Sequence, residues 1–211
     1  MGETTVLLHT CCAPCSSAII EAMMANGITP VIYYCNPNIY PQEEYEIRKE
    51  ECTRYAQTLG LEIVDADYDH DNWLDQMKGL ESEPERGGRC FKCFKLRLLR
   101  TAQYARQRGI RVITTTLASS RWKSLDQINE AGLWACNTLS QAAAQNSCDV
   151  SGHISDILPE VKTIPPEKEV LWWDQNWRKG GLQERRLQII KEYDFYNQLY
   201  CGCEFSMRKE D

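Results

Sequence analysis

The chain has 211 residues, a net charge of −6 and eleven cysteines. The length exceeds the ~150 residues of an average domain but allows one domain, so we expect a single α/β domain over residues 1–211. The start of the chain lacks a signal-peptide pattern and no window approaches the ~18 apolar residues of a membrane span, so we expect a cytoplasmic protein with no membrane partner. Cysteines in that compartment argue against a disulfide framework and favour metal or redox chemistry.

Charged residues are segregated along the chain. Residues 1–85 carry 16 acidic and 4 basic side chains, whereas residues 86–123 carry 11 basic and no acidic ones. A basic block of this kind is typical of a phosphate-binding surface, as for nucleic acid. It is equally typical of a solvated helix face that pairs with acidic residues elsewhere, so charge alone leaves both interpretations open.

Apolar runs alternate with amphipathic segments through the first half of the chain. We expect strands at residues 5–10, 30–35, 61–66 and 110–117, and helices at 14–26, 42–59, 90–107 and 182–193. Apolar strands separated by helices predict a parallel sheet covered on both faces. Residues 136–170 show no clear period, and we expect an insertion there.

Three polar groups follow strands of the predicted sheet. Cys11, Cys12 and Cys15 come after the first strand, residues 36–40 after the second and residues 115–123 after the fourth. Ligands of such open sheets bind beyond the carboxyl ends of the strands. We therefore expect a site at this edge.

Seven cysteines occur in three close-set groups. Residues three or four apart at a helix start share one face, and residues two apart in an extended chain share one side. The groups are Cys11, Cys12 and Cys15; Cys90 and Cys93; and Cys201 and Cys203. Three groups that each point one way suit a thiolate site assembled from distant segments. The other cysteines, Cys35, Cys52, Cys136 and Cys148, are isolated, and we expect them to be structural.

The number of cysteines leaves several chemistries open. One tetrahedral zinc or one [4Fe–4S] cluster needs four thiolates, so seven leave three spare or form two metal centres. Structural zinc ligands usually lie on two short knuckles, and the dispersal seen here favours a cluster in a catalytic pocket. The alternatives are a thiol–disulfide oxidoreductase that uses Cys12 and Cys15, and a zinc-dependent nucleic-acid-binding module.

Several motifs together resemble one family. The chain contains LLHTCCAPCS, YYCNPNIYPQEEYEIRKEE, EPERGGRCFKCFKLRLLRTA, TTTLASSRWKS and FYNQLYCGCEFS, in an order and spacing that strongly resemble the QueH-type epoxyqueuosine reductases. The resemblance implies a fold related to the nucleotide-binding (HUP-like) ATP-pyrophosphatase class, with a C-terminal elaboration closing the metal site. It also implies a [4Fe–4S] cluster with a second mononuclear iron, a tRNA substrate bound through its anticodon loop and an external electron donor. The implied reaction is cobalamin-independent reduction of epoxyqueuosine to queuosine at the wobble position.

The chain departs from the family pattern at a few positions. Cys15 stands where the family often has aspartate, Asn197 where arginine is usual, and Trp177 where phenylalanine is usual. If position 15 is a ligand, the second metal site is richer in sulfur here.

The resemblance and the motifs together suggest roles for individual residues. We expect the cluster on Cys12, Cys90, Cys93 and Cys203 and a substrate-facing second iron on Cys11, Cys15 and Cys201, although spacing permits other partitions equally well. The candidates for substrate binding are Asn36, Asn38, Tyr40, Arg89, Arg97, Lys123 and Arg178. We expect Trp172, Trp173 and Trp177 to be core rather than base-stacking residues, and His9 to be a core histidine.

Overall fold

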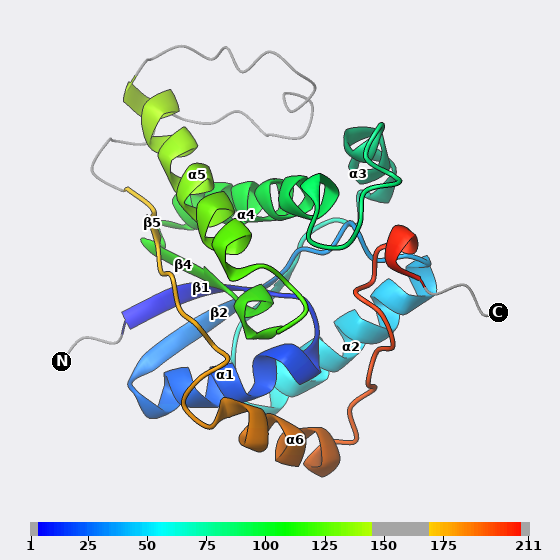
Figure 1. Cartoon of the computed structure of the whole chain (residues 1–211). Coiled ribbons are helices and arrows are strands. Elements are labelled where there is room, and N and C mark those ends of the chain that lie inside the picture. The colour runs from blue at the N-terminus through cyan, green and yellow to red at the C-terminus, as the bar shows by residue number, and fades with distance from the viewer. Residues whose placement is uncertain (1–3, 145–168, 208–211) are drawn as a thin grey trace.

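The structure is a computed structural model, and it describes residues 4–144 and 169–207. The strands are β1 (Thr4–Thr10), β2 (Ile28–Tyr34), β3 (Ile63–Asp65), β4 (Val112–Thr115) and β5 (Leu171–Trp172). The α-helices are α1 (Ala13–Ala25), α2 (Gln42–Thr58), α3 (His70–Met77), α4 (Gly88–Arg108), α5 (Leu125–Ala144) and α6 (Leu182–Glu192). Two short 3-10 helices, η1 (Thr116–Ser119) and η3 (Glu204–Ser206), complete the chain order shown in Figure 1.

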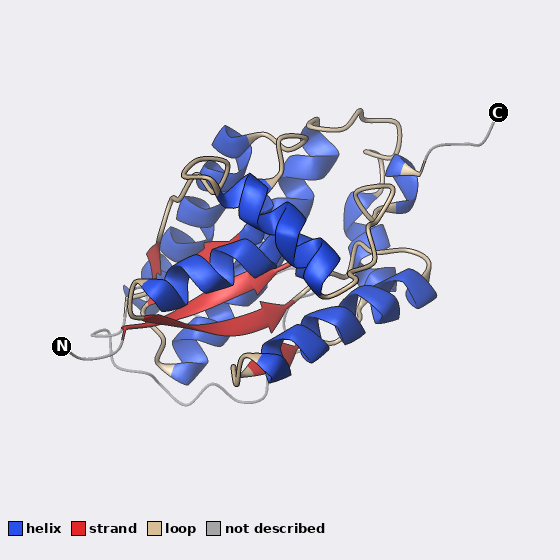
Figure 2. Cartoon of the chain, turned by 90° about the horizontal axis from the view of Figure 1, so that it is seen from below, coloured by secondary structure: helices blue, strands red, loops and turns tan. Residues whose placement is uncertain are grey.

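All five strands form one parallel sheet, which confirms the predicted α/β fold. Their order is β3-β2-β1-β4-β5, and β1 pairs with both β2 and β4. The chain builds outward from β1 to β3 on one side and then crosses to β4 and β5 on the other. The carboxyl ends of β1 and β4 therefore form a topological switch point, where sheets of this kind bind ligands. Figure 2 shows the central strands running in one direction.

Helices cover both faces of the sheet. In Figure 1, α1, α2 and α6 lie on one side, and α4 and α5 lie on the other. Side chains of β1 are buried between these layers, with Leu7 and Leu8 inaccessible to solvent. A strand buried on both faces explains why the apolar run is continuous rather than alternating.

Two helices and one strand were not expected from the sequence. Helix α3 lies in the acidic segment after β3, and α5 continues through residues 136–144, part of the region expected to be an insertion. Strand β5 is a two-residue edge strand. The rest of the expected insertion, with Cys148, lies outside the described residues except for residues 169 and 170. Among the described helices, none is long and apolar enough to cross a membrane.

His9 is a core residue, as predicted. Its Nε2 lies 3.1 Å from the Cys35 carbonyl oxygen, which can only accept, so Nε2 carries the proton and Nδ1 accepts from the Thr115 hydroxyl at 2.7 Å. Burial, aided by the charge of Arg97, lowers the pKa of His9 to about 3. This neutral imidazole joins β1, β2 and β4 below the switch point.

The tryptophans near β5 pack inward, as predicted. Trp177 is buried and meets Trp173 edge-on, with ring centroids 5.3 Å apart. Trp172 lies against Gly132 of α5, where an added Cβ would come within 2.2 Å of the indole. Only glycine fits at that crossing, so Gly132 lets the edge strand approach α5.

Candidate metal centre

The switch point holds three cysteines in close contact. Cys11 and Cys12 follow β1 directly, and Cys15 lies in the first turn of α1. Cys12 is the extended N-cap residue of that helix, and a proline occupies its first turn, where the missing N–H costs no helical hydrogen bond. The three Sγ atoms lie within 4.8 Å of one another, and those of Cys11 and Cys12 are 3.8 Å apart. Of the described residues, no other group of three His, Cys, Asp or Glu ligand atoms is as compact.

The three thiols shift one another's pKa in opposite directions. Hydrogen bonds from Cys12 and Cys15 hold the pKa of Cys11 well below its ordinary value. Burial raises the pKa of Cys12, and the hydrogen bond to Cys11 raises the pKa of Cys15 to about 12. A helix N-terminus adds further support for a thiolate. Proton loss from the other two thiols, which metal binding requires, needs a cation to offset the added charge.

Side chains from distant segments orient this trio. The Thr116 hydroxyl, at the start of η1, lies 3.5 Å from Cys11 Sγ and accepts the Cys11 backbone N–H. Gln198 Nε2 lies 2.9 Å from Cys12 Sγ and 3.6 Å from Cys15 Sγ. The Gln198 Oε1 atom is buried without a hydrogen-bond partner among the described residues. The amide therefore points its donor at the sulfurs.

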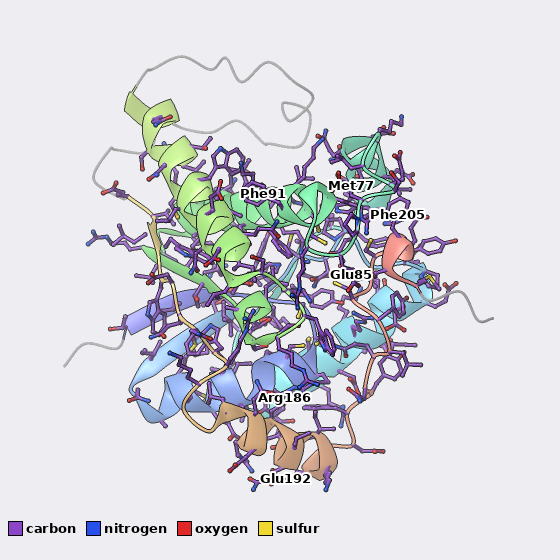
Figure 3. The ribbon with its side chains drawn as sticks, in the orientation of Figure 1. Met77, Glu85, Phe91, Arg186, Glu192 and Phe205 are labelled. Carbon is purple, nitrogen blue, oxygen red and sulfur yellow. The ribbon has the colours of Figure 1, made fainter. Side chains whose placement is uncertain are left out.

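A second group of thiols lies where α4 begins and the C-terminal segment returns. Cys93 and Cys203 are buried together with Trp73 and Met77 of α3, and Phe205 packs against them. Figure 3 labels Met77, on α3, and Phe205, on η3, which lie next to each other in this view. Burial, and then the charges of Cys201 and Cys93, raise the pKa of Cys90.

Burial and neighbouring charges also shift the pKa values of Cys203 and Cys93. Burial and the charge of Cys93 raise the pKa of Cys203 to about 12. Burial also raises the pKa of Cys93, against the charge of Arg97. The cysteines of α4 and those of the C-terminal segment therefore lie within electrostatic range of one another.

Two cations, the half-buried Lys123 and the buried Arg97, lie within electrostatic range of both thiol groups. Although burial opposes it, the charges of Cys201, Cys11 and Cys15 raise the pKa of Lys123. In the same way, against burial, Cys93, Cys11, Cys35 and Cys201 raise the pKa of Arg97. Residues of all three sequence groups therefore meet at one edge of the sheet, around Lys123 and Arg97.

The cysteine-bearing C-terminal segment is held by α2 and the loop after β2. Arg48, buried and paired with Glu44 at 2.6 Å, donates to the carbonyl oxygens of Tyr200 and Cys201. Tyr40 N–H donates to the Gly202 carbonyl oxygen at 2.8 Å. Gly202 has φ +113°, a conformation that disfavours other residues.

The space beside Gly202 is also restricted. An added Cβ would lie 3.0 Å from Ile39 and 3.1 Å from the Arg48 guanidinium. The glycine between the two cysteines therefore permits a close approach that positions both thiols.

Four of the expected substrate-binding residues donate side-chain hydrogen bonds to backbone carbonyl oxygens of the protein itself. Asn36 and Arg97 hydrogen-bond to each other, Asn36 donates to the Thr10 carbonyl oxygen, and Arg97 donates to that of Cys35. Arg89 donates to three carbonyl oxygens of the loop at residues 80–83. Arg178 donates to backbone carbonyls of residues 120 and 123.

The other three expected substrate-binding residues do not donate side-chain hydrogen bonds to the backbone of the described residues in this way. Asn38 is buried, and its Oδ1 has no hydrogen-bond partner among the described residues. Tyr40 is 43% exposed and stacks on His70, with centroids 5.5 Å apart. Lys123 lies within electrostatic range of Cys201, Cys11 and Cys15, as described above.

Sequence reasoning missed several residues that build the site. Gln198, Thr116, Trp73 and Arg48 orient cysteines or their backbone, yet none belongs to a short motif with metal-ligand spacing. The glycine between Cys201 and Cys203 was the one available signal for the tight approach there. These residues act through tertiary contacts, which spacing along the chain does not reveal.

A parallel α/β sheet with a compact cysteine trio at its switch point, and cysteines of two further segments within electrostatic range, defines a thiol-rich class of α/β protein whose trio could hold a metal ion. The chain matches the family described as epoxyqueuosine reductase QueH over residues 6–153 and 136–209. Relatives with that name are 45% identical in Histophilus somni and 44% identical in Haemophilus influenzae, each match covering 98% of this chain and 74% and 73% of the relative. The Thermotoga maritima relative is 31% identical, with 96% of this chain and 90% of the relative covered.

This chain belongs to the epoxyqueuosine reductase QueH family.

Proposed function

We propose that this protein reduces epoxyqueuosine to queuosine at the wobble position of tRNA, using a [4Fe–4S] cluster and a second iron held by its cysteines. The observation that carries the proposal is the compact group of Cys11, Cys12 and Cys15, in a chain that belongs to this family and holds four more cysteines within electrostatic range of one another and of Lys123 or Arg97. A dithiol switch needs two cysteines and a zinc site needs four, so neither accounts for seven.

The compact spacing of the Cys11, Cys12 and Cys15 sulfurs favours a division of the seven ligands into three and four. We place the second iron on Cys11, Cys12 and Cys15, which leaves an open coordination position, and the cluster on Cys90, Cys93, Cys201 and Cys203. The 3.8 Å between the sulfurs of Cys11 and Cys12 fits the edge of about 3.8 Å of a tetrahedron with metal–sulfur bonds of about 2.3 Å. This partition differs from our sequence-based one, in which Cys12 was a ligand of the cluster and Cys201 a ligand of the second iron.

The reaction requires two electrons and two protons. Both carbon–oxygen bonds of the epoxide break, a carbon–carbon double bond forms, and the oxygen leaves as water. When bound, the metals supply single electrons and a Lewis acid. The chain supplies the surroundings: Thr116 and Gln198 orient thiolates, and Lys123 offsets their charge. Asn38 and Tyr40 remain available to the substrate.

The partners follow from this chemistry. The substrate is tRNA, which binds through its anticodon loop. In that loop a base leaves the stack and enters a pocket more easily than it does in a duplex. An external donor provides the electrons. Because the substrate is tRNA, we expect the protein to act in the cytoplasm. The strand order supports the expected relation to the ATP-pyrophosphatase class.

A thiol–disulfide oxidoreductase is the second candidate, because the sulfurs of Cys12 and Cys15 lie within 4.8 Å. Iron and acid-labile sulfide analysis after anaerobic purification separates the candidates. Our proposal predicts a brown protein that contains both, whereas the dithiol enzyme and a zinc module are colourless. Mass analysis of tRNA nucleosides from cells that lack the gene then tests the reaction: epoxyqueuosine should accumulate, and normal queuosine in a cell without a second reductase rejects the proposal.

A further inference from the structure

The loop of residues 120–123 joins η1 to α5 at the rim of the candidate metal centre. Ser119, immediately before the loop, donates to the Cys15 carbonyl oxygen at 3.4 Å. Three residues further on, the side chain of Trp122 is 65% exposed. A large exposed aromatic surface therefore lies close in the chain to a contact with the site.

Two arginines hold this loop in one conformation. Arg178 donates to the carbonyl oxygens of Ser120 at 2.7 Å and Lys123 at 2.8 Å. Arg86 donates to those of Arg121 at 2.9 Å and Trp122 at 3.0 Å. Four consecutive carbonyls are thus bound by two guanidinium groups. A loop held in this way loses little conformational entropy when a partner binds to its side chains.

Arg86 also connects the loop to the cysteines. It has φ +66°, outside the usual range for a residue with a side chain, and its backbone N–H lies 3.3 Å from Cys90 Sγ. Its carbonyl oxygen accepts from the Gln127 side chain at 2.8 Å. The position of Trp122 is therefore fixed relative to both α4 and the thiols.

The charge around Trp122 indicates an anionic partner. The guanidinium of Arg121 lies 5.1 Å from the Trp122 ring centroid. Both belong to the stretch 86–123, with eleven basic and no acidic side chains. Of these basic side chains, all of them in the described part of the chain, Arg108 is the one that forms an ion pair, with Glu62. The exposed side chains of Arg111 and Arg121 have no acidic partner among the described residues.

We infer that Trp122 and Arg121 form a docking platform for a single-stranded nucleotide of the anticodon loop, next to the modified one. The indole stacks on the base, and the guanidinium neutralises a neighbouring phosphate. An aromatic ring beside a cation suits this ligand because every base has a π-face and every nucleotide a phosphate. The inference rests on the proposed function for its RNA partner and adds to it a named contact outside the metal centre.

The test uses the metal-loaded enzyme and a fluorescent anticodon stem-loop RNA, with affinity measured by anisotropy. Trp122→Ala should weaken binding about 5-fold to 150-fold, equivalent to ~1–3 kcal/mol for one stacked base. Trp122→Phe should restore most of the affinity. Arg121→Ala should reduce the slope of log Kd against log salt by about one.

Trp134→Ala is the matched control. Trp134 is also exposed, at 37%, and has a cation, Lys95, 5.0 Å from its ring. It lies nine residues into α5, about 14 Å along the helix from the loop. Trp134→Ala should bind the RNA like the unmodified protein, and the thermal unfolding of Trp122→Ala should match that of the unmodified protein.

The outcomes distinguish this inference from the proposed function. Equal RNA affinity of Trp122→Ala and the unmodified protein overturns the platform, as does an equal loss in Trp134→Ala. If the unmodified protein reduces epoxyqueuosine in tRNA while Trp122→Ala does so with the same KM, the platform is wrong and the proposed function stands. If the stem-loop binds through Trp122 and no epoxyqueuosine is reduced, the proposed function is wrong and the platform stands.

Discussion

Replacing Gly202 by alanine should displace both C-terminal cysteines. The residue has φ +113°, and its Cβ would lie 3.0 Å from Ile39 Cγ1 and 3.1 Å from Arg48 Nη1. A side chain in the left-handed region costs about 1–2 kcal/mol, and overpacking of a filled space costs about 1–3 kcal/mol more. We therefore expect Gly202→Ala to lower the free energy of unfolding by about 2–5 kcal/mol.

Urea unfolding of the metal-free chain measures that loss, and iron analysis of anaerobically purified protein measures the effect on the site. Gly60→Ala provides the control, since Gly60 has φ +67° and nothing within 4 Å of its added Cβ. This control should lose only the conformational part, about 1–2 kcal/mol, and keep its full iron content. If Gly202→Ala matches Gly60→Ala in both stability and iron content, the close approach at Gly202 does not position the cysteines.

Three further substitutions test single contacts. Arg48→Met should destabilise the chain by about 3–5 kcal/mol because it leaves Glu44 buried without its cationic partner. A loss under about 1 kcal/mol in urea unfolding would contradict the importance of this ion pair for stability. Gln198→Leu should make the midpoint potential of the bound iron more negative, since hydrogen bonds to thiolates favour the reduced state; an unchanged potential in a spectroscopic redox titration refutes this role. Gly132→Ala should lower the free energy of unfolding by about 1–3 kcal/mol, measured by thermal unfolding, because the added Cβ clashes with Trp172. The iron content should not change. An unchanged Tm would show that α5 and β5 are not in close contact.

The sheet and four of its helices were predictable because their patterns are local. Continuous apolar runs marked β1 and β2, and glycines ended α1, α2 and α4 near the expected positions. Helix α5 was missed although Ile128, Ala131 and Ala135 form a buried stripe, because small alanines give a weak apolar signal. Helix α3 buries Trp73 and Met77 in an acidic segment, and eight residues are too few for a clear period.

The site was predictable as a set of cysteines but not as an arrangement. Spacing placed each group on one face, and the rule for parallel sheets placed Cys11, Cys12 and Cys15 at the edge where the strands end. The closeness of Cys12 to Cys11 and Cys15 depends on the β1–α1 turn, and the approach of Cys201 depends on Arg48 and the loop after β2. The contact of Arg48 with the Cys201 backbone spans 153 positions, which no local pattern encodes.

The most direct test of the account is the reaction itself. The anaerobically purified, iron-loaded protein is mixed with a chemical reductant and tRNA that carries epoxyqueuosine, and the nucleosides are analysed by mass. The account predicts loss of epoxyqueuosine and an equal gain of queuosine, both abolished when iron is removed. Unchanged epoxyqueuosine with a fully loaded protein, or conversion by protein without iron, would contradict it.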